Sequence, residues 1–307
     1  MTTSLKTQGF EFFRWSKKHP VGTIPAEVAK EGAGENRIPF THLANSVPTY
    51  LYFSTLLRES KKTRASVLDV GCGTGRNITF VKQTVKKKFQ YFCIDYSQAC
   101  INYARLQYGK HGVVYTQHEG KILPFPDATF DYIVSSHVLE HIAKKDAETY
   151  VREIARLLKK GGVAVIGTPN RTYCQDLFYM NPTENKKYRL VLPHLHEYYA
   201  KEILGLFRGT RRYKKVQLLQ TTNKICRELM RRGAEAIRPR EGLIGTSRFE
   251  IYNILRQNSL LQDFMAKVGS EWMIRGMHTS YSELLNATEL SDKHPENGDN
   301  FIVVATT

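Results

Sequence analysis

The feature that most constrains the fold of this chain is an alternation of strand-like and helix-like segments between residues 66 and 170. Short apolar runs, which are typical of buried strands, occupy 66–70, 89–94, 113–116, 130–135 and 163–167. Apolar residues recur at helical spacing between these runs, over 77–87, 98–109 and 144–159. Strands that alternate with helices in this way predict βαβ units, and so a doubly wound α/β fold with a mostly parallel sheet.

The flanking segments predict further elements of the same domain. We expect a helix over the mouth of the sheet at 47–57, a helix at 199–207, and strands at 216–221 and 301–306. Residues 223–268 are predicted to be mostly helical, and 294–299 form a turn. We therefore predict one domain over 61–307, with an N-terminal extension or lid over 1–60. A helical insertion at about 222–298 precedes the last strand.

The chain is strongly basic. Its 45 Lys and Arg residues exceed its 29 Asp and Glu residues, which gives a formal net charge of +16. Such an excess favours anionic partners, namely nucleic acid, a phospholipid surface or an acidic substrate. The cations form short clusters at 61–64, 86–88, 211–215 and 231–232. Because clusters beside the ends of elements usually only solvate a surface, nucleic-acid binding is not favoured.

The cysteines and the apolar runs bear on the cellular compartment. Five scattered cysteines form no CxxC pair, so we expect free thiols rather than disulfides or a cysteine-rich zinc site. No run approaches the roughly 18 apolar residues of a membrane-spanning helix. Residues 1–13 lack the apolar stretch of a secretory signal. We therefore expect a cytoplasmic protein without a transmembrane segment.

The strongest local signal is a loop with three alternate glycines after the first strand, in the sequence VLDVGCGTGRN at 67–77. Glycines at these positions let the chain turn sharply into a helix while its backbone touches a ligand. The dinucleotide fingerprint needs glycine where Arg76 stands, and a phosphate-binding P-loop sequence is absent. The loop therefore suits a zwitterionic amino-acid tail, whose ammonium group would face Asp69 directly or through water. A turn without a ligand is the alternative.

This stretch resembles motif I of the class I S-adenosylmethionine-dependent methyltransferases. One βαβ unit later, Asp95 closes the second strand, where an acidic side chain can accept both ribose hydroxyls. Alone, such a residue is more often a helix cap. Residues 116–131 resemble the family stretch G-D-A-x-x-L-P-F-P-D-x-S-F-D, which implies that Glu119 and Gly120 contact the adenine. The departures are Glu119 for the usual Asp and His118 for Gly.

Two later segments extend the resemblance. Residues 135–142 resemble the family stretch S-x-x-x-L-E-H-[VI], which implies that Ser136 and His137 lie near the sulfonium and the methyl acceptor. Residues 157–170 resemble the helix, turn and strand that close the core. The implied cofactor is S-adenosyl-L-methionine, bound by Asp69, Gly71, Gly73, Thr74, Gly75, Asp95, Tyr96, Glu119, Gly120, Ser136 and His137.

The resemblance covers about residues 60–222 and 301–306. It implies a Rossmann-like sheet of seven strands, mostly parallel, whose final strand is antiparallel. It also implies methyl transfer by in-line displacement to a small-molecule, glycan or lipid-linked acceptor, with a hydroxyl preferred. A hydroxyl must lose its proton, so a base is useful. The candidates by position are His137, His141 and His196.

Two other functions remain open. The net charge is compatible with methylation of RNA, although the D/N-P-P-[FY] motif of base amino-group methyltransferases is absent after the fourth strand. The chain could also be a non-catalytic module that binds S-adenosylmethionine.

A zinc site is a third alternative, because residues 137–141 also spell H-x-x-E-H, a zinc-peptidase signature. On a helix, His137 and His141 would share a face, and Glu148 or Glu153 could supply a third ligand. The cofactor pocket already explains this segment, so we predict no metal.

Overall fold

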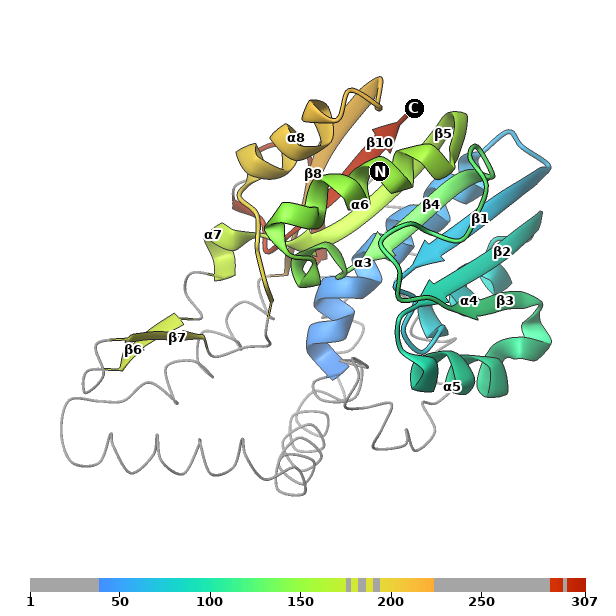
Figure 1. Ribbon diagram of the computed structural model, residues 1–307, viewed down its shortest axis with the longest axis horizontal. Helices are drawn as coiled ribbons and strands as arrows, with labels where there is room; N and C mark the ends of the chain where they lie inside the picture. Colours follow the sequence, from blue (N-terminus) through green and yellow to red (C-terminus); the bar gives the residue numbers. More distant parts are fainter. Residues whose placement is uncertain (1–38, 175–177, 182–185, 190–193, 224–287, 295–296) are drawn as a thin grey trace.

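The computed structural model describes residues 39–174, 178–181, 186–189, 194–223, 288–294 and 297–307. Its main sheet has eight strands in the order β3-β2-β1-β4-β5-β10-β8-β9 (Figure 1). The strands of the sheet are β1 Arg64–Val70, β2 Lys88–Asp95, β3 Val113–Gln117, β4 Phe130–Ser136, β5 Leu158–Pro169, β8 Lys215–Asn223, β9 Thr288–Ser291 and β10 Asn300–Thr306. A separate hairpin pairs β6 Phe178–Asn181 with β7 Lys186–Arg189.

The sheet is parallel from β3 to β5, because β1 pairs with β2 and β4, β2 with β3, and β4 with β5 in parallel. The strand β10 is antiparallel to both β5 and β8, and β9 is antiparallel to β8. The mixed, doubly wound sheet and all seven predicted strands are confirmed. The predicted count of seven is one short, because β9 has only four residues and a single apolar one, Leu290.

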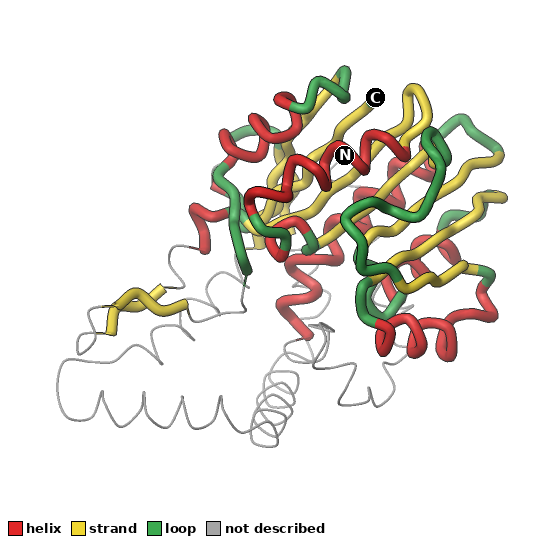
Figure 2. Tube along the Cα trace, viewed as in Figure 1, coloured by secondary structure: helices red, strands yellow, loops and turns green. Residues whose placement is uncertain are grey.

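Helices cover both faces of the sheet (Figure 2). One core lies between the sheet and the helices α3 Pro39–Glu59, α4 Arg76–Thr84 and α5 Gln98–Tyr108. A second core lies between the opposite face and the helices α6 Ala147–Leu157 and α8 Ala200–Gly209. Short helices complete the described chain: η1 Gly109–His111, η2 Leu139–His141, η3 Lys144–Asp146 and α7 Arg171–Cys174. Alternate residues of each strand point to opposite cores, so Val67 and Leu68 of β1 belong to different ones.

The helix α3 belongs to this packing. It lies beside α4 and contacts β4 and β5, and its residues Val47, Phe53 and Leu57 are fully buried. Gly167 of β5 lets α3 come close, because a Cβ there would lie 2.2 Å from Oγ1 of Thr49. The first turns of α3 project beyond the carboxyl ends of the central strands (Figure 1). The described part of the predicted N-terminal extension is therefore an integral part of the fold.

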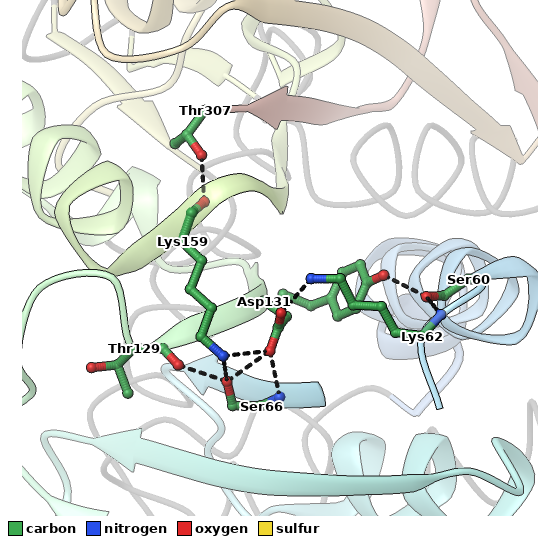
Figure 3. A network of polar contacts seen from close by, with 8 residues as sticks. Ser60, Lys62, Ser66, Thr129, Asp131, Lys159 and Thr307 are labelled. Carbon is green, nitrogen blue, oxygen red and sulfur yellow. Dashed lines mark hydrogen bonds and ion pairs between the residues drawn. The ribbon is translucent and has the colours of Figure 1, made fainter. Parts of the chain in front are cut away.

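A polar network joins the amino ends of β1, β4 and β5 around Asp131 (Figure 3). Its carboxylate accepts hydrogen bonds from Lys62, from Nζ of Lys159 at 2.9 Å, and from the backbone N–H of Ser66 at 2.9 Å. Burial alone would raise the pKa of Asp131, but these donors outweigh burial and hold that pKa below its ordinary value. The carbonyl of Lys159 also accepts a bond from Oγ1 of Thr307 at 2.7 Å, which fixes the end of the chain to β5.

Several predictions fall outside the described residues. The helices predicted over 223–268 fall, apart from residue 223, in the range 224–287, which the structure does not describe. Most of the predicted lid falls in 1–38, which is also outside the described residues. The domain boundaries therefore stay predictions. Within the described ranges, no helix is both long enough and apolar enough to cross a bilayer.

Candidate functional site

The glycine loop follows β1 at the carboxyl edge of the sheet. Gly71, Gly73 and Gly75 all have positive φ, at 75°, 52° and 74°, a region that favours glycine. A Cβ on Gly71 would lie 2.1 Å from Cγ2 of Val138, so the chain there has no room for a side chain. A Cβ on Gly73 would meet no described atom within 4 Å. The main chain at Gly73 therefore borders open space, whereas Thr74 beside it is buried.

Asp69 lies beneath this loop and is fully buried. The hydroxyl of Tyr50, on α3, donates to its two carboxylate oxygens at 3.1 and 3.0 Å. Burial raises the pKa of Asp69 to about 8, the hydrogen bond from Tyr50 opposes this rise, and the charge of Asp95 adds to it. Contact of Asp69 with a ligand's ammonium group stays a prediction, and Tyr50 is a partner that the sequence did not reveal.

The raised pKa makes the stability of the ligand-free chain depend on pH. The folded Asp69 binds a proton up to about pH 8, whereas in the unfolded chain it ionises near pH 4, so stability falls between these values. We expect the wild type to lose about 2 kcal/mol relative to Asp69→Asn between pH 6 and pH 8. Urea unfolding of both proteins at several pH values measures this difference. Parallel pH profiles would contradict the assignment.

Asp95 ends β2 and faces the glycine loop. Its Oδ2 accepts a hydrogen bond from the backbone N–H of Gly73 at 2.7 Å, and its Oδ1 accepts one from the N–H of Ser97 at 3.0 Å. The helix cap that follows is Ser97, whose hydroxyl accepts from the N–H of Cys100, so Asp95 itself is not the cap of α5. Each carboxylate oxygen has a second lone pair, which leaves capacity for ligand hydroxyls.

Removal of the Asp95 carboxylate should weaken cofactor binding. We expect Asp95→Ala to reduce the affinity for S-adenosylmethionine by about 1–3 kcal/mol, because ligand hydroxyls and the Gly73 amide lose their acceptor. Isothermal titration calorimetry measures this change. Asp127→Ala is the control, because Asp127 is exposed and pairs with Arg156 before the amino end of β4, at the edge of the sheet opposite the loop. An unchanged dissociation constant in Asp95→Ala would remove Asp95 from the ribose role.

The residues predicted to contact adenine lie at the carboxyl ends of β2 and β3. Tyr96 follows Asp95 and is 60% exposed, an unusual exposure for a large ring. The amide of Gln117 donates to the carbonyl of Tyr96 at 3.1 Å and to Oε1 of Glu119 at 2.8 Å. Gly120 packs against the ring of His118, because a Cβ there would lie 2.8 Å from Nε2. Glu119 and Tyr96 are therefore joined by one side chain at the rim of the sheet.

Ser136 is the last residue of β4 and His137 comes next, so both lie at the same edge of the sheet as the glycine loop. Oγ of Ser136 is buried and has no hydrogen-bond partner among the described residues. His137 adopts φ 58°, which is uncommon for a residue with a side chain, and its N–H donates to the carbonyl of Gly167 at 2.9 Å. This hydrogen bond fixes the main chain of His137 at the end of β5. Nε2 of the ring is also buried without a partner in the described part of the chain.

Glu140 organises the histidines. Its side chain is fully buried, its Oε1 lies 2.8 Å from Nδ1 of His137, and its Oε2 accepts a bond from the hydroxyl of Thr168 at 3.0 Å. Burial would raise the pKa of Glu140, but the neighbouring histidines 137, 194 and 141 outweigh burial and hold that pKa below its ordinary value. Glu140 is thus an ionised carboxylate at the centre of an imidazole cluster.

Of the three predicted base candidates, His137 and His141 lie beside the Glu140 carboxylate, whereas His196 contacts only its backbone carbonyl. The ring of His141 contacts the ring of His194 edge to face, with centroids 4.9 Å apart. The N–H of His196 donates to the carbonyl of Glu140 at 3.1 Å, and its Nε2 lies 3.6 Å from Glu202. Burial lowers the pKa of His196, and the charge of Glu202 opposes this. His194 was not predicted, because it lies 54 residues after Glu140 and no spacing rule joins them.

The peptidase-like zinc arrangement is not formed. Residues 139–141 form a 3₁₀ turn rather than an α-helix, so His137 and His141 do not share a helical face. The two expected third ligands are engaged elsewhere: Glu148 pairs with Arg152 at 2.7 Å, and Glu153 pairs with Arg156 at 2.7 Å.

Two of the basic clusters meet at the opposite edge of the sheet. Residues 60–64 and 86–88 line a hollow of about 610 Å³ beside the amino ends of β1 and β2. Lys62 pairs with Asp131, and Lys87 donates to three carbonyls at the end of α3. The seven residues of β1 separate this hollow from the glycine loop by about 20 Å. The basic hollow and the glycine loop are therefore separate surfaces.

Comparison with known proteins gives matches in the central segment. Residues 68–166 match the family described as "Methyltransferase domain". A Mycobacterium tuberculosis protein named as a probable S-adenosylmethionine-dependent methyltransferase is 33% identical over 109 residues, 36% of this chain and 37% of that protein. A Mycolicibacterium smegmatis fatty-acid O-methyltransferase is 30% identical over 121 residues, 38% of this chain and 42% of that protein. The matched stretches thus span less than half of these relatives.

Among solved structures, a SAM-dependent methyltransferase from Thermotoga maritima aligns with 87% of this chain and 92% of its own, at 16% identity and a TM-score of 0.49.

Proposed function

We propose that this chain methylates a hydroxyl group of a small-molecule, glycan or lipid-linked acceptor. The proposal starts from its class I S-adenosylmethionine-dependent methyltransferase domain. The observation that carries the choice of a hydroxyl is the pair of His137 and Glu140. Oε1 of Glu140 lies 2.8 Å from Nδ1 of the ring, and Nε2 is buried without a hydrogen-bond partner in the described chain. An imidazole held in this way is suited to accept a proton.

The glycine loop supports the cofactor role. Gly73 borders open space, and the Asp95 carboxylate accepts its N–H at 2.7 Å, which suits a ligand with a net positive charge. In the proposed assignment, the loop 71–75 holds the amino-acid end of the cofactor and Asp95 holds its ribose. Tyr96 and residues 119–120 border the adenine. S-adenosylmethionine supplies an activated methyl group on a sulfonium.

The pair of His137 and Glu140 supplies the base that a hydroxyl acceptor needs. Nε2 of His137 accepts the proton of the acceptor hydroxyl, and the ionised Glu140 stabilises the resulting imidazolium. The hydroxyl of Ser136, which is also buried and without a described partner, can donate to the acceptor and orient it. Proximity and orientation supply most of the remaining acceleration.

A fatty-acid O-methyltransferase among the relatives supports an oxygen acceptor, but a carboxylate would need no base. The test is a screen of cell extract with methyl-labelled S-adenosylmethionine, followed by mild alkali treatment of the labelled product. We expect the label on a small or lipid-linked compound as an alkali-stable ether. An alkali-labile ester would show that the acceptor is a carboxylate and would contradict the hydroxyl assignment.

Other outcomes of the same screen favour the alternatives. Label on RNA would favour RNA methylation, and its binding should then fall steeply with salt. The basic hollow is the surface for such an anionic partner, but it lies about 20 Å from the glycine loop along β1. Cofactor binding without transfer to any compound would favour a non-catalytic binding module.

A further inference from the structure

We propose that Glu140, His141 and His194 form a binding site for one divalent metal ion, with Zn²⁺ as the ion that fits best. One ligand atom from each residue lies within 4.8 Å of the other two. Two imidazoles and a carboxylate are the donor set that zinc takes in sites with an open position. Ligand atoms on a tetrahedral zinc lie about 3.4 Å apart, so small side-chain rotations close the set.

A neighbouring carboxylate orients His194. Its Nδ1 lies 2.6 Å from Oε1 of Glu197, and both side chains are nearly buried. A neutral imidazole that gives its Nδ1 proton to a carboxylate presents the lone pair of Nε2 to the other side. This carboxylate–histidine arrangement is the one that orients histidines bound to metals. The buried Glu197 thereby acquires a role that the proposed methyl transfer does not give it.

Glu140 is anchored by the strand beside it. The hydroxyl of Thr168 donates to Oε2, whereas Oε1 is buried, lies 2.8 Å from Nδ1 of His137, and accepts no hydrogen bond from the described residues. Carboxylates that bind metals are themselves held by hydrogen bonds in this manner. The carboxylate is fully buried, with the ring of His137 at 2.8 Å and ligand atoms of His141 and His194 within 4.8 Å, so it is held at the centre of the cluster.

His141 lies on the solvent side of the cluster. Its side chain is exposed, and among the described residues its ring has an edge-to-face contact with His194 but no hydrogen bond. The backbone N–H of Leu195 donates to the carbonyl of Glu140 at 2.8 Å, which fastens the segment of His194 beside η2. The three donors are thus held together by the backbone, and the exposed side of His141 leaves a coordination position open to solvent.

This site differs from the H-x-x-E-H arrangement, because His137 pairs with Glu140 while His194 joins His141. Glu140 is shared with the proposed base pair, but metal uptake can be measured without knowing the acceptor, so the two proposals can fail separately. Zinc affinity should fall with decreasing pH, because imidazole must be unprotonated to bind a metal.

The test is calorimetric titration of the full, metal-stripped chain, without a polyhistidine tag, with ZnCl₂. We expect one zinc per chain, an affinity at least about 100-fold weaker in both His141→Ala and His194→Ala, and an affinity about 10–100-fold weaker in Glu197→Gln. His111→Ala, a change on η1 away from the cluster, should bind as the wild type does. Circular dichroism confirms that each variant is folded. The absence of zinc uptake by the wild type, or an unchanged affinity in His141→Ala or His194→Ala, would overturn the proposal.

Discussion

A chain with Gly73 replaced by leucine should remain folded but should bind S-adenosylmethionine at least about 100-fold more weakly, a loss of about 2.7 kcal/mol or more. A Cβ at this position meets no described atom within 4 Å, so the folded chain has room for the new side chain. That room is the space in which the proposed cofactor would lie against the main chain. Calorimetry with S-adenosylmethionine measures the loss, and thermal unfolding reports whether the fold persists.

The control for this variant is Gly161→Leu. Gly161 also has positive φ, at 75°, and a Cβ there would meet no described atom within 4 Å. It lies in β5, and its N–H donates to the carbonyl of Thr307 at 3.1 Å. The two variants therefore share the backbone strain of a side chain at positive φ, and only Gly73→Leu reaches the loop. Gly75 is less informative, because a Cβ there would lie 2.6 Å from the ring of Tyr115 and would disturb the fold. Unchanged binding in Gly73→Leu would exclude the loop as the cofactor site.

The second large effect is expected at His137. We expect His137→Asn to lower kcat by about 10²–10⁴-fold, the usual contribution of a positioned general base. Asparagine tolerates the positive φ of this residue, so the backbone at the end of β4 is retained. In the wild type, methyl transfer should slow at low pH because the base becomes protonated. In His137→Asn this decline at low pH should be absent.

The control for His137 is His111→Asn, a change on η1 that should leave kcat unchanged. Cofactor affinity should change far less than kcat in His137→Asn, because the lost group acts on the acceptor proton. An unchanged kcat would show that no base is required, and would point to an amine or a carboxylate acceptor instead.

The predictable parts of this protein were those set by local sequence. Buried parallel strands are short apolar runs, and Gly71, Gly73 and Gly75 stand where the backbone takes positive φ, so both features appear in the sequence itself. The same holds for Asp95, whose position is fixed by the end of β2. Strand β9 was missed because four residues with one apolar side chain carry no such signal.

The unpredicted parts depend on contacts between distant segments. Tyr50 reaches Asp69 because α3 packs across the sheet, and the sequence of α3 predicts a helix without indicating which strand it covers. Glu140 and His194 meet because the segment before α8 returns to the end of β4. The ions around Asp131 meet for a similar reason, since three strands begin side by side. None of these pairs has a fixed spacing that a sequence pattern could reveal.

The most direct measurement is a crystal structure of the chain with S-adenosylhomocysteine, the product that remains after methyl transfer. If the glycine loop is the cofactor site, we expect ligand density against the main chain of residues 71–75. Both ribose hydroxyls should then lie within hydrogen-bond distance of the Asp95 carboxylate. Density at another surface, or a loop closed by neighbouring side chains with the ligand absent at saturating concentration, would contradict this assignment.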